Sequence, residues 1–163
     1  MRIKMAVAGL ALAAGIASAQ PAGEEAFEKL KSLSGEWEAS LPGSGKLTSS
    51  IRLVSNGTAI EETIGSPADN EVSLYTRIDD RILLTHFCAL TPDGHQVRLE
   101  TRGVSAPDHL VFTLVGTANL HSMAAPHMRR VLLTIIDRDH FRERWTKTEA
   151  GKDTVFDLQF VRR

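Results

Sequence analysis

The chain has a single cysteine, Cys88, and this scarcity is the first constraint on its fold. One thiol cannot close a disulfide within the chain, so a hydrophobic core has to stabilise the domain. An excess of charge of one sign is also lacking, because 19 Lys and Arg residues stand against 20 Asp and Glu residues. Without a basic patch the sequence shows no footprint for nucleic acid or anionic lipid, and we expect no nucleic-acid partner.

Long hydrophobic runs are lacking except near the N-terminus. Arg2 and Lys4 precede an apolar run, Met5 to Ile16, that is too short for a permanent membrane span of about 20 residues. Ala17-Ser18-Ala19 then fits the small-x-small site that a signal peptidase accepts. The pattern predicts a cleavable secretory signal peptide, and a buried N-terminal helix is the alternative.

After the signal, one segment has a helical pattern and the rest alternates as strands do. Phe27, Leu30 and Leu33 recur at three-residue spacing, which predicts a short helix over 26–33. From residue 35 onward apolar and polar residues alternate, and turn residues recur roughly every eight to twelve positions. The predicted strands are 35–41, 46–55, 58–65, 70–78, 81–90, 95–103, 109–116, 128–136, 139–148 and 153–162.

About ten consecutive strands after one helix are typical of an up-and-down barrel, because closure removes the unpaired edges of an open sheet. We therefore predict an all-β fold for residues 20–163: one domain, an antiparallel up-and-down barrel of about ten strands with a short N-terminal helix. A barrel of this width has room for a small ligand. A β-sandwich with the same strands is the alternative.

Three of these strands place polar side chains on faces that are otherwise apolar. His86 and Cys88 alternate with apolar residues and would project into the barrel about 7 Å apart. Glu62 lies between two isoleucines at the same period, and Glu143 shares a face with Trp145. An isolated buried charge costs several kcal/mol, so such groups must pair with each other or with a ligand.

Two further residues join this group by their strands. His127 precedes a strand in which every second residue is apolar, and it falls on the same face as those apolar residues. Arg98 lies on a strand whose inward face the pattern does not define. We expect Arg98 to join Glu62 and His86 in one polar cluster. The predicted ligand-binding residues are Glu62, His86, Cys88, Arg98, His127, Glu143 and Trp145.

Each of these residues also has an ordinary structural interpretation. A single buried His or Cys is usually a core residue, and either Glu could bond to Arg98 or to turn backbone. His86 and Cys88 could hold Zn²⁺ or copper together with His127, but their spacing matches no known zinc pattern, and we predict no metal site. No phosphate loop, nucleophile elbow or HExxH helix is present, so the sequence defines neither a catalytic residue nor a cofactor.

The segment Phe27 to Trp37, read as F-x-x-L-x-x-L-x-G-x-W, resembles the opening of calycin-type barrels. In those families a short helix leads into a strand whose Gly-x-Trp, here Gly35 and Trp37, closes the base of the barrel. More of the chain resembles a group of secreted bacterial proteins of unassigned function, distantly similar to nitrobindin-type barrels. The matching pieces are Asn56 to Glu62, Leu84 to Cys88, Gln96 with Arg98, Asn119-Leu120, His127-Met128 and Glu143 with Trp145.

The resemblance implies a ten-stranded, calycin-like barrel with these polar positions, and it implies no particular activity. Nitrobindin-type proteins hold haem through a histidine at the barrel mouth. By order along the chain, His127 and His140 correspond to that histidine, but neither lies in a matching motif. The resemblance therefore assigns no haem ligand, and the cofactor is left open.

The leading expectation is a non-catalytic exported barrel that binds a small, partly apolar molecule in its interior. An enzyme that uses a buried Glu with His86, with or without a metal, is the first alternative. A structural or interaction barrel, whose interior polar residues bond only to each other, is the second. The volume of the interior distinguishes them, because a structural barrel would be filled.

Export makes a direct prediction about the mature N-terminus. Residues 1–19 are expected to be removed, so the protein recovered from the periplasm or the medium should begin at Gln20 and carry no integral membrane segment. N-terminal sequencing or intact mass measurement of that fraction tests this. Protein that begins at Met1, or that stays in the cytoplasm, would contradict it.

Overall fold

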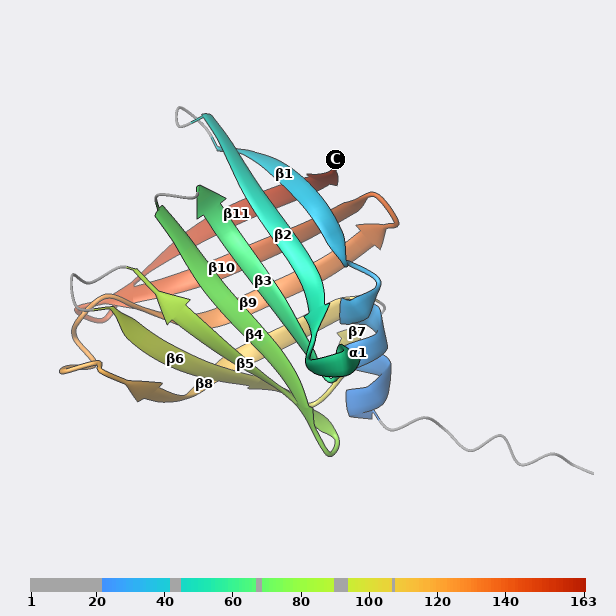
Figure 1. The fold of residues 1–163 in the computed structure, drawn as a ribbon. Helices are drawn as coiled ribbons and strands as arrows, with labels where there is room; N and C mark the ends of the chain where they lie inside the picture. The colour runs from blue at the N-terminus through green and yellow to red at the C-terminus, as the bar shows by residue number, and fades with distance from the viewer. Residues whose placement is uncertain (1–21, 42–44, 67–68, 90–93, 107) are drawn as a thin grey trace, which may run out of the picture.

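The structure is a computed structural model that describes residues 22–41, 45–66, 69–89, 94–106 and 108–163, and the predicted signal peptide lies outside these residues. Strands account for most of the described chain, after a single α-helix (Figure 1). The helix and the 3₁₀ turn are α1 (Ala22–Lys31) and η1 (Ser55–Gly57). The strands are β1 (Gly35–Leu41), β2 (Gly45–Val54), β3 (Ala59–Ser66), β4 (Asp69–Ile78), β5 (Arg81–Cys88), β6 (His95–Thr101), β7 (Val104–Ala106), β8 (His109–Ala118), β9 (His127–Asp137), β10 (His140–Glu149) and β11 (Lys152–Arg162).

A continuous ring of antiparallel pairings joins ten of these strands. Strands β1 to β6 pair in chain order, as do β8 to β11, and β11 returns to pair with β1. The pairing of β6 with β8, from Gln96↔Ala118 to Glu100↔Thr113, closes the ring. The predicted all-β barrel is therefore confirmed for the described residues, and the β-sandwich alternative is wrong because the ring of pairings is unbroken.

The ten predicted strands match the observed ones to within two residues at each end. The helix begins at Ala22, four residues before its predicted start. The short strand β7, which adds to the edge of β8, was not predicted. It has only three residues, too few for alternation to be recognised.

Aromatic side chains fill one half of the barrel. Phe141 stacks on Phe160 with 4.6 Å between ring centroids, and Trp37 meets Phe141 edge-on at 4.7 Å. Helix α1 covers this end at the β4–β5 turn, where Gly23 approaches Asp80 so closely that a Cβ would lie 2.5 Å from the Asp80 carbonyl carbon. The aromatic layer and the helix together close one end of the barrel.

Gly35 and Trp37 join the helix to the first strand. The Trp37 indole N–H donates to the Leu33 carbonyl at 2.8 Å. The Arg162 guanidinium, from the last strand, lies 4.0 Å from the centroid of the Trp37 ring and donates to the Ser34 carbonyl at 2.9 Å. Gly35 has a φ of +144°, and a Cβ there would collide with the Arg162 guanidinium, so this position requires glycine.

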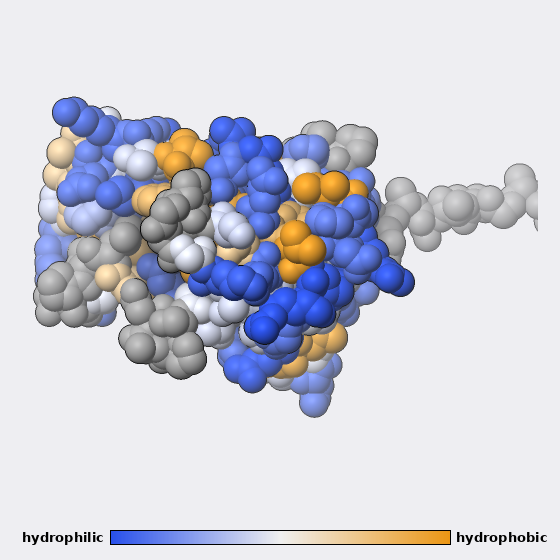
Figure 2. All heavy atoms as spheres, turned by 90° about the horizontal axis from the view of Figure 1, so that it is seen from above, coloured by the Kyte–Doolittle hydropathy of each residue, from blue (hydrophilic) through white to orange (hydrophobic). Residues whose placement is uncertain are grey.

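The face of the molecule seen in Figure 2 is predominantly polar. Figure 2 shows a mostly hydrophilic face on which hydrophobic side chains form small separate groups. Among the described residues, the one α-helix has ten residues and is too short and too polar to cross a membrane.

The Trp37 bond makes a stability prediction. Trp37→Phe leaves the buried Leu33 carbonyl without its donor, and we expect the free energy of unfolding to fall by about 1–3 kcal/mol in urea titrations. Arg52→Ala, which removes an exposed ion pair with Glu61 on the outer wall, is the control and should change it by about 0–1 kcal/mol. Equal decreases in the free energy of unfolding for the two substitutions would show that the indole hydrogen bond does not stabilise the helix end of the barrel.

Candidate functional site

The half of the barrel away from the helix is hollow. It contains a cavity of about 450 Å³ whose walls come from β2 to β5 and from β9 to β11. Glu71 and Ala89 lie at the ends of β4 and β5 opposite to the turn that α1 covers, so the cavity and the helix occupy opposite ends. The lining residues are Leu47, Glu62, Ile64, Gly65, Glu71, Ser73, His86, Ala89, Met128, Glu143, Trp145, Phe156 and Leu158.

Two buried carboxyl groups form the polar floor of this cavity. Glu62, on β3, accepts hydrogen bonds from the Ser49 hydroxyl at 2.8 Å and from the Tyr75 hydroxyl at 2.9 Å. Glu143, on β10, accepts one from the Trp145 indole at 2.8 Å. Glu62 is 2% exposed and Glu143 is completely buried, so both charges would be shielded from water.

The two carboxyl groups titrate as a coupled pair. Burial raises the pKa of Glu62, against the effect of its bonds from Ser49 and Tyr75 and of the nearby His86. Burial raises the pKa of Glu143 well above its usual range, and the negative charge of Glu62 raises it further. No donor from the described residues reaches Glu143 Oε1. Of the two carboxyl groups, Glu143 therefore has the more strongly raised pKa, and burial favours its protonated form the more.

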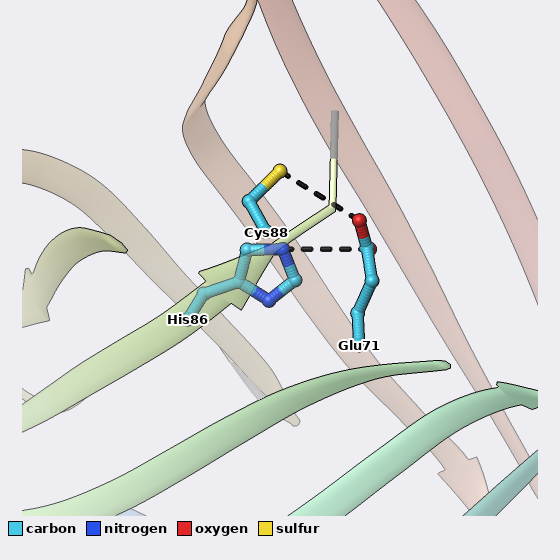
Figure 3. Close-up of side chains that lie close together, drawn as sticks. All are labelled: Glu71, His86 and Cys88. Carbon is cyan, nitrogen blue, oxygen red and sulfur yellow. Dashed lines mark hydrogen bonds and ion pairs between the residues drawn. The ribbon is translucent and has the colours of Figure 1, made fainter. Parts of the chain in front are cut away.

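A second polar group lies beside the first, around His86 (Figure 3). His86 is 2% exposed, its Nδ1 lies 3.0 Å from the Ser73 hydroxyl, and its Nε2 lies 3.5 Å from a Glu71 carboxylate oxygen. The other Glu71 oxygen accepts from the Ala89 backbone N–H at 3.0 Å and from the Cys88 thiol at 3.7 Å. Glu71, His86 and Cys88 thus bring three types of metal-binding atom together.

Charge interactions extend this group beyond the three residues. Burial acts to raise the pKa of Glu71, but the nearby His86 imidazole and the hydrogen bonds from Ala89 and Cys88 lower it below its usual value. Burial, followed by the charges of His127 and His86, lowers the pKa of His95, which lies directly across from Cys88 on β6. The barrel end near the cavity is therefore rich in imidazole and carboxylate groups.

The tryptophan Trp145 connects the two polar groups. Its indole N–H donates to Glu143, and its ring lies 4.7 Å from the His86 ring, centroid to centroid. Of the predicted ligand-binding residues, Glu62, His86, Glu143 and Trp145 line the cavity, and Cys88 is buried next to it.

The prediction that Arg98 joins Glu62 and His86 is wrong. Arg98 is exposed on the outer face of β6, paired with Thr85, because Val97 and Leu99 on either side of it point into the core. The donors that Glu62 needs are the hydroxyls of Ser49 and Tyr75, not a guanidinium.

His127 is buried, but Met128 lines the cavity in its place. A register shift between β9 and β10 pairs Met128 with Lys147, so Met128 continues the inward face and simple alternation fails for its neighbour. The His127 Nδ1 lies 2.8 Å from the Ala125 carbonyl. His140, the other histidine considered for haem, is half exposed and paired with Asp137 at 2.8 Å.

Sequence reasoning missed several site residues on β4. Glu71, Ser73 and Tyr75 point inward, whereas the more apolar Val72 and Leu74 lie on the outer side, so hydrophobic alternation indicates the wrong face. The turn at Asp79-Asp80 carried the missing signal. A two-residue hairpin loop fixes the register, and counting back from it places Ser73 opposite His86.

No family model matches this chain, and no curated protein sequence matches it. The resemblance to calycin-type and nitrobindin-type barrels therefore stays a prediction.

The carboxyl pair predicts a pH dependence of stability. Because the folded state holds the Glu143 proton more tightly than the unfolded chain does, the stabilisation is present at acid pH and is lost as the pH rises through the raised pKa. Glu143→Gln keeps the size of the side chain and cannot ionise, so its free energy of unfolding should exceed that of the parent increasingly from pH 5 to pH 8, by about 1 kcal/mol or more. Glu149→Gln, at an exposed site, is the control. Parallel profiles for Glu143→Gln and the parent would refute the coupled pair.

Proposed function

We propose that the barrel binds a small molecule with an apolar body and a hydrogen-bond-donating, positively charged end. The observation that carries this proposal is the cavity of about 450 Å³ with the carboxyl pair at its floor. A barrel that served only as a structural element would be filled at this place, as its other half is.

Size and lining support a ligand with an apolar body. The cavity volume lies within the roughly 300–1,000 Å³ of small-molecule sites, which are mostly apolar with few polar groups. Most of the wall is aliphatic or aromatic, with side chains drawn from five strands. These apolar lining residues are Leu47, Ile64, Met128, Trp145, Phe156 and Leu158.

The charges of the lining support a cationic end. The lining residues include three carboxyl groups, those of Glu62, Glu71 and Glu143, and no Lys or Arg. Among the described residues of the two neighbouring strands, the donors to the buried Glu62 are the neutral hydroxyls of Ser49 and Tyr75, so its charge is hydrogen-bonded and not neutralised by them. A ligand ammonium group would compensate that buried charge, which is worth more in a cavity than in water.

Acid–base catalysis is the second candidate. It is supported by the raised pKa of Glu143, since groups with shifted pKa values beside a cavity are candidates for proton transfer. Glu143 would act as the acid, and His86 lines the same cavity. Export to the periplasm or outside the cell, which the signal pattern favours, remains part of the proposal for either function.

Calorimetric titration with three ligands of equal chain length tests the binding proposal. A primary alkylamine should bind more tightly than the matching alcohol, and the carboxylic acid most weakly, with a chelator present throughout. Glu62→Gln should reduce the preference for the amine over the alcohol by about tenfold, a change of about 1.4 kcal/mol. Arg98→Ala on the outer face is the control and should leave the order unchanged.

The outcome that overturns the proposal is a dissociation constant above about 1 mM for all three ligands, or the tightest binding for the acid.

A second measurement distinguishes binding from catalysis. The bound ligand is recovered and its mass measured after incubation. An unchanged mass supports binding, whereas chemical conversion that Glu143→Gln abolishes would support catalysis.

A further inference from the structure

Three different metal-binding atoms meet at the end of the cavity. Glu71 lies on β4, and His86 and Cys88 lie two residues apart on the neighbouring β5, so all three side chains point to the same side of the sheet (Figure 3). Their carboxylate oxygen, imidazole nitrogen and sulfur all lie within 4.8 Å of one another. Figure 3 shows the imidazole and the thiol both directed at the carboxylate.

The distances between these atoms are close to those around a tetrahedral zinc ion. Zinc bonds of 2.0–2.3 Å at tetrahedral angles place neighbouring ligand atoms about 3.3–3.6 Å apart. His86 Nε2 is 3.5 Å from one Glu71 oxygen, and Cys88 Sγ is 3.7 Å from the other. The imidazole and the thiol would need to approach each other by about 1.2 Å or less, which a small side-chain rotation can provide.

Neighbouring groups hold the ligands in this orientation. The Ser73 hydroxyl lies 3.0 Å from His86 Nδ1, and the Ala89 N–H donates to Glu71 at 3.0 Å. The Trp145 ring packs against the imidazole with 4.7 Å between centroids. Outer contacts of this kind fix the ring orientation and tautomer of a metal-binding histidine.

The surroundings of His86 Nε2 suit a cation. The atom is buried and makes no hydrogen bond within the described residues, although a Glu71 oxygen lies 3.5 Å from it. When Nδ1 donates its proton to Ser73, Nε2 presents a lone pair to the Glu71 carboxylate, and two acceptor atoms then face each other 3.5 Å apart. A metal ion between them satisfies both atoms.

From this geometry we propose that Glu71, His86 and Cys88 bind a Zn²⁺ ion at the wall of the cavity. Binding forms a Zn–S bond as the thiol releases its proton to solvent. The thiolate and the carboxylate then balance the charge of the ion, which lowers the cost of burying it. The mixed sulfur, nitrogen and oxygen donor set suits Zn²⁺, and three protein ligands leave a fourth position for water. The proposal goes beyond the small-molecule function and does not depend on it.

Cobalt(II) titration of the untagged, reduced and chelator-treated protein tests the site directly, without any organic ligand. One equivalent of Co²⁺ should give a thiolate-to-cobalt charge-transfer band and the visible bands of a tetrahedral ion, and one equivalent of Zn²⁺ should abolish both. The dissociation constant for Zn²⁺ should be about 1 µM or lower. A titration without these bands, or with only octahedral Co²⁺ bands, overturns the proposal in the parent protein itself.

Near-isosteric variants then assign the ligands. Cys88→Ser and Glu71→Gln should each weaken Zn²⁺ binding by more than about 100-fold, and Ser73→Ala should weaken it by about tenfold. His140→Ala removes an exposed histidine at the far end of β10 and should leave binding unchanged. Zn²⁺ should raise the melting temperature of the parent but not that of Cys88→Ser. Binding that survives Cys88→Ser, or is lost in His140→Ala, would place the metal elsewhere and refute the site.

Discussion

The pairing of β6 with β8 is the contact on which the rest of the structure depends. In an open sheet each face could be covered or exposed, but in a ring one face of every strand must point inward. That requirement buries Glu62, Glu143 and His86, because each shares its strand face with core residues. The chain accommodates them by hydroxyl and indole donors from neighbouring strands, and not by salt bridges to Arg or Lys. Closure of the sheet therefore buries these polar side chains and also brings beside them the strands that supply their hydrogen-bond donors.

The interior is divided between packing and space. The stacked aromatic layer at the helix end resembles an ordinary core, with the Trp37 and Arg162 contacts fixing the first and last strands to each other. The other end keeps a cavity, and the buried carboxyl pair lies where the two halves meet. This division concentrates stability at one end and leaves the other end free to carry titratable groups whose burial lowers stability.

The sequence was informative where polar and apolar residues alternate without interruption. The strand with Ile82, Leu84, His86 and Cys88 shows this best, and its inward face is the one that the pattern indicates. Prediction failed where the backbone departs from strict alternation, as at the register shift beside Met128. It also failed on β4, where the outward face is the more hydrophobic one. It failed for Arg98 because the sequence pattern did not define which face of β6 points inward. The grouping of Glu71 with His86 and Cys88 depends on how β4 pairs with β5, and the pattern of residues within either strand does not reveal this register.

Trp145 gives the two polar groups a common partner. Its N–H is bonded to the carboxyl pair while its ring face rests on the imidazole, so the indole cannot reorient without disturbing both. If a ligand in the cavity displaces this ring, it changes the affinity of the site beside His86 for a metal ion. Thermodynamic reciprocity then requires that the metal ion change the affinity for the ligand by the same factor. Trp145 would then couple two binding sites inside the barrel. The state reached at equilibrium would be the same whichever site is filled first.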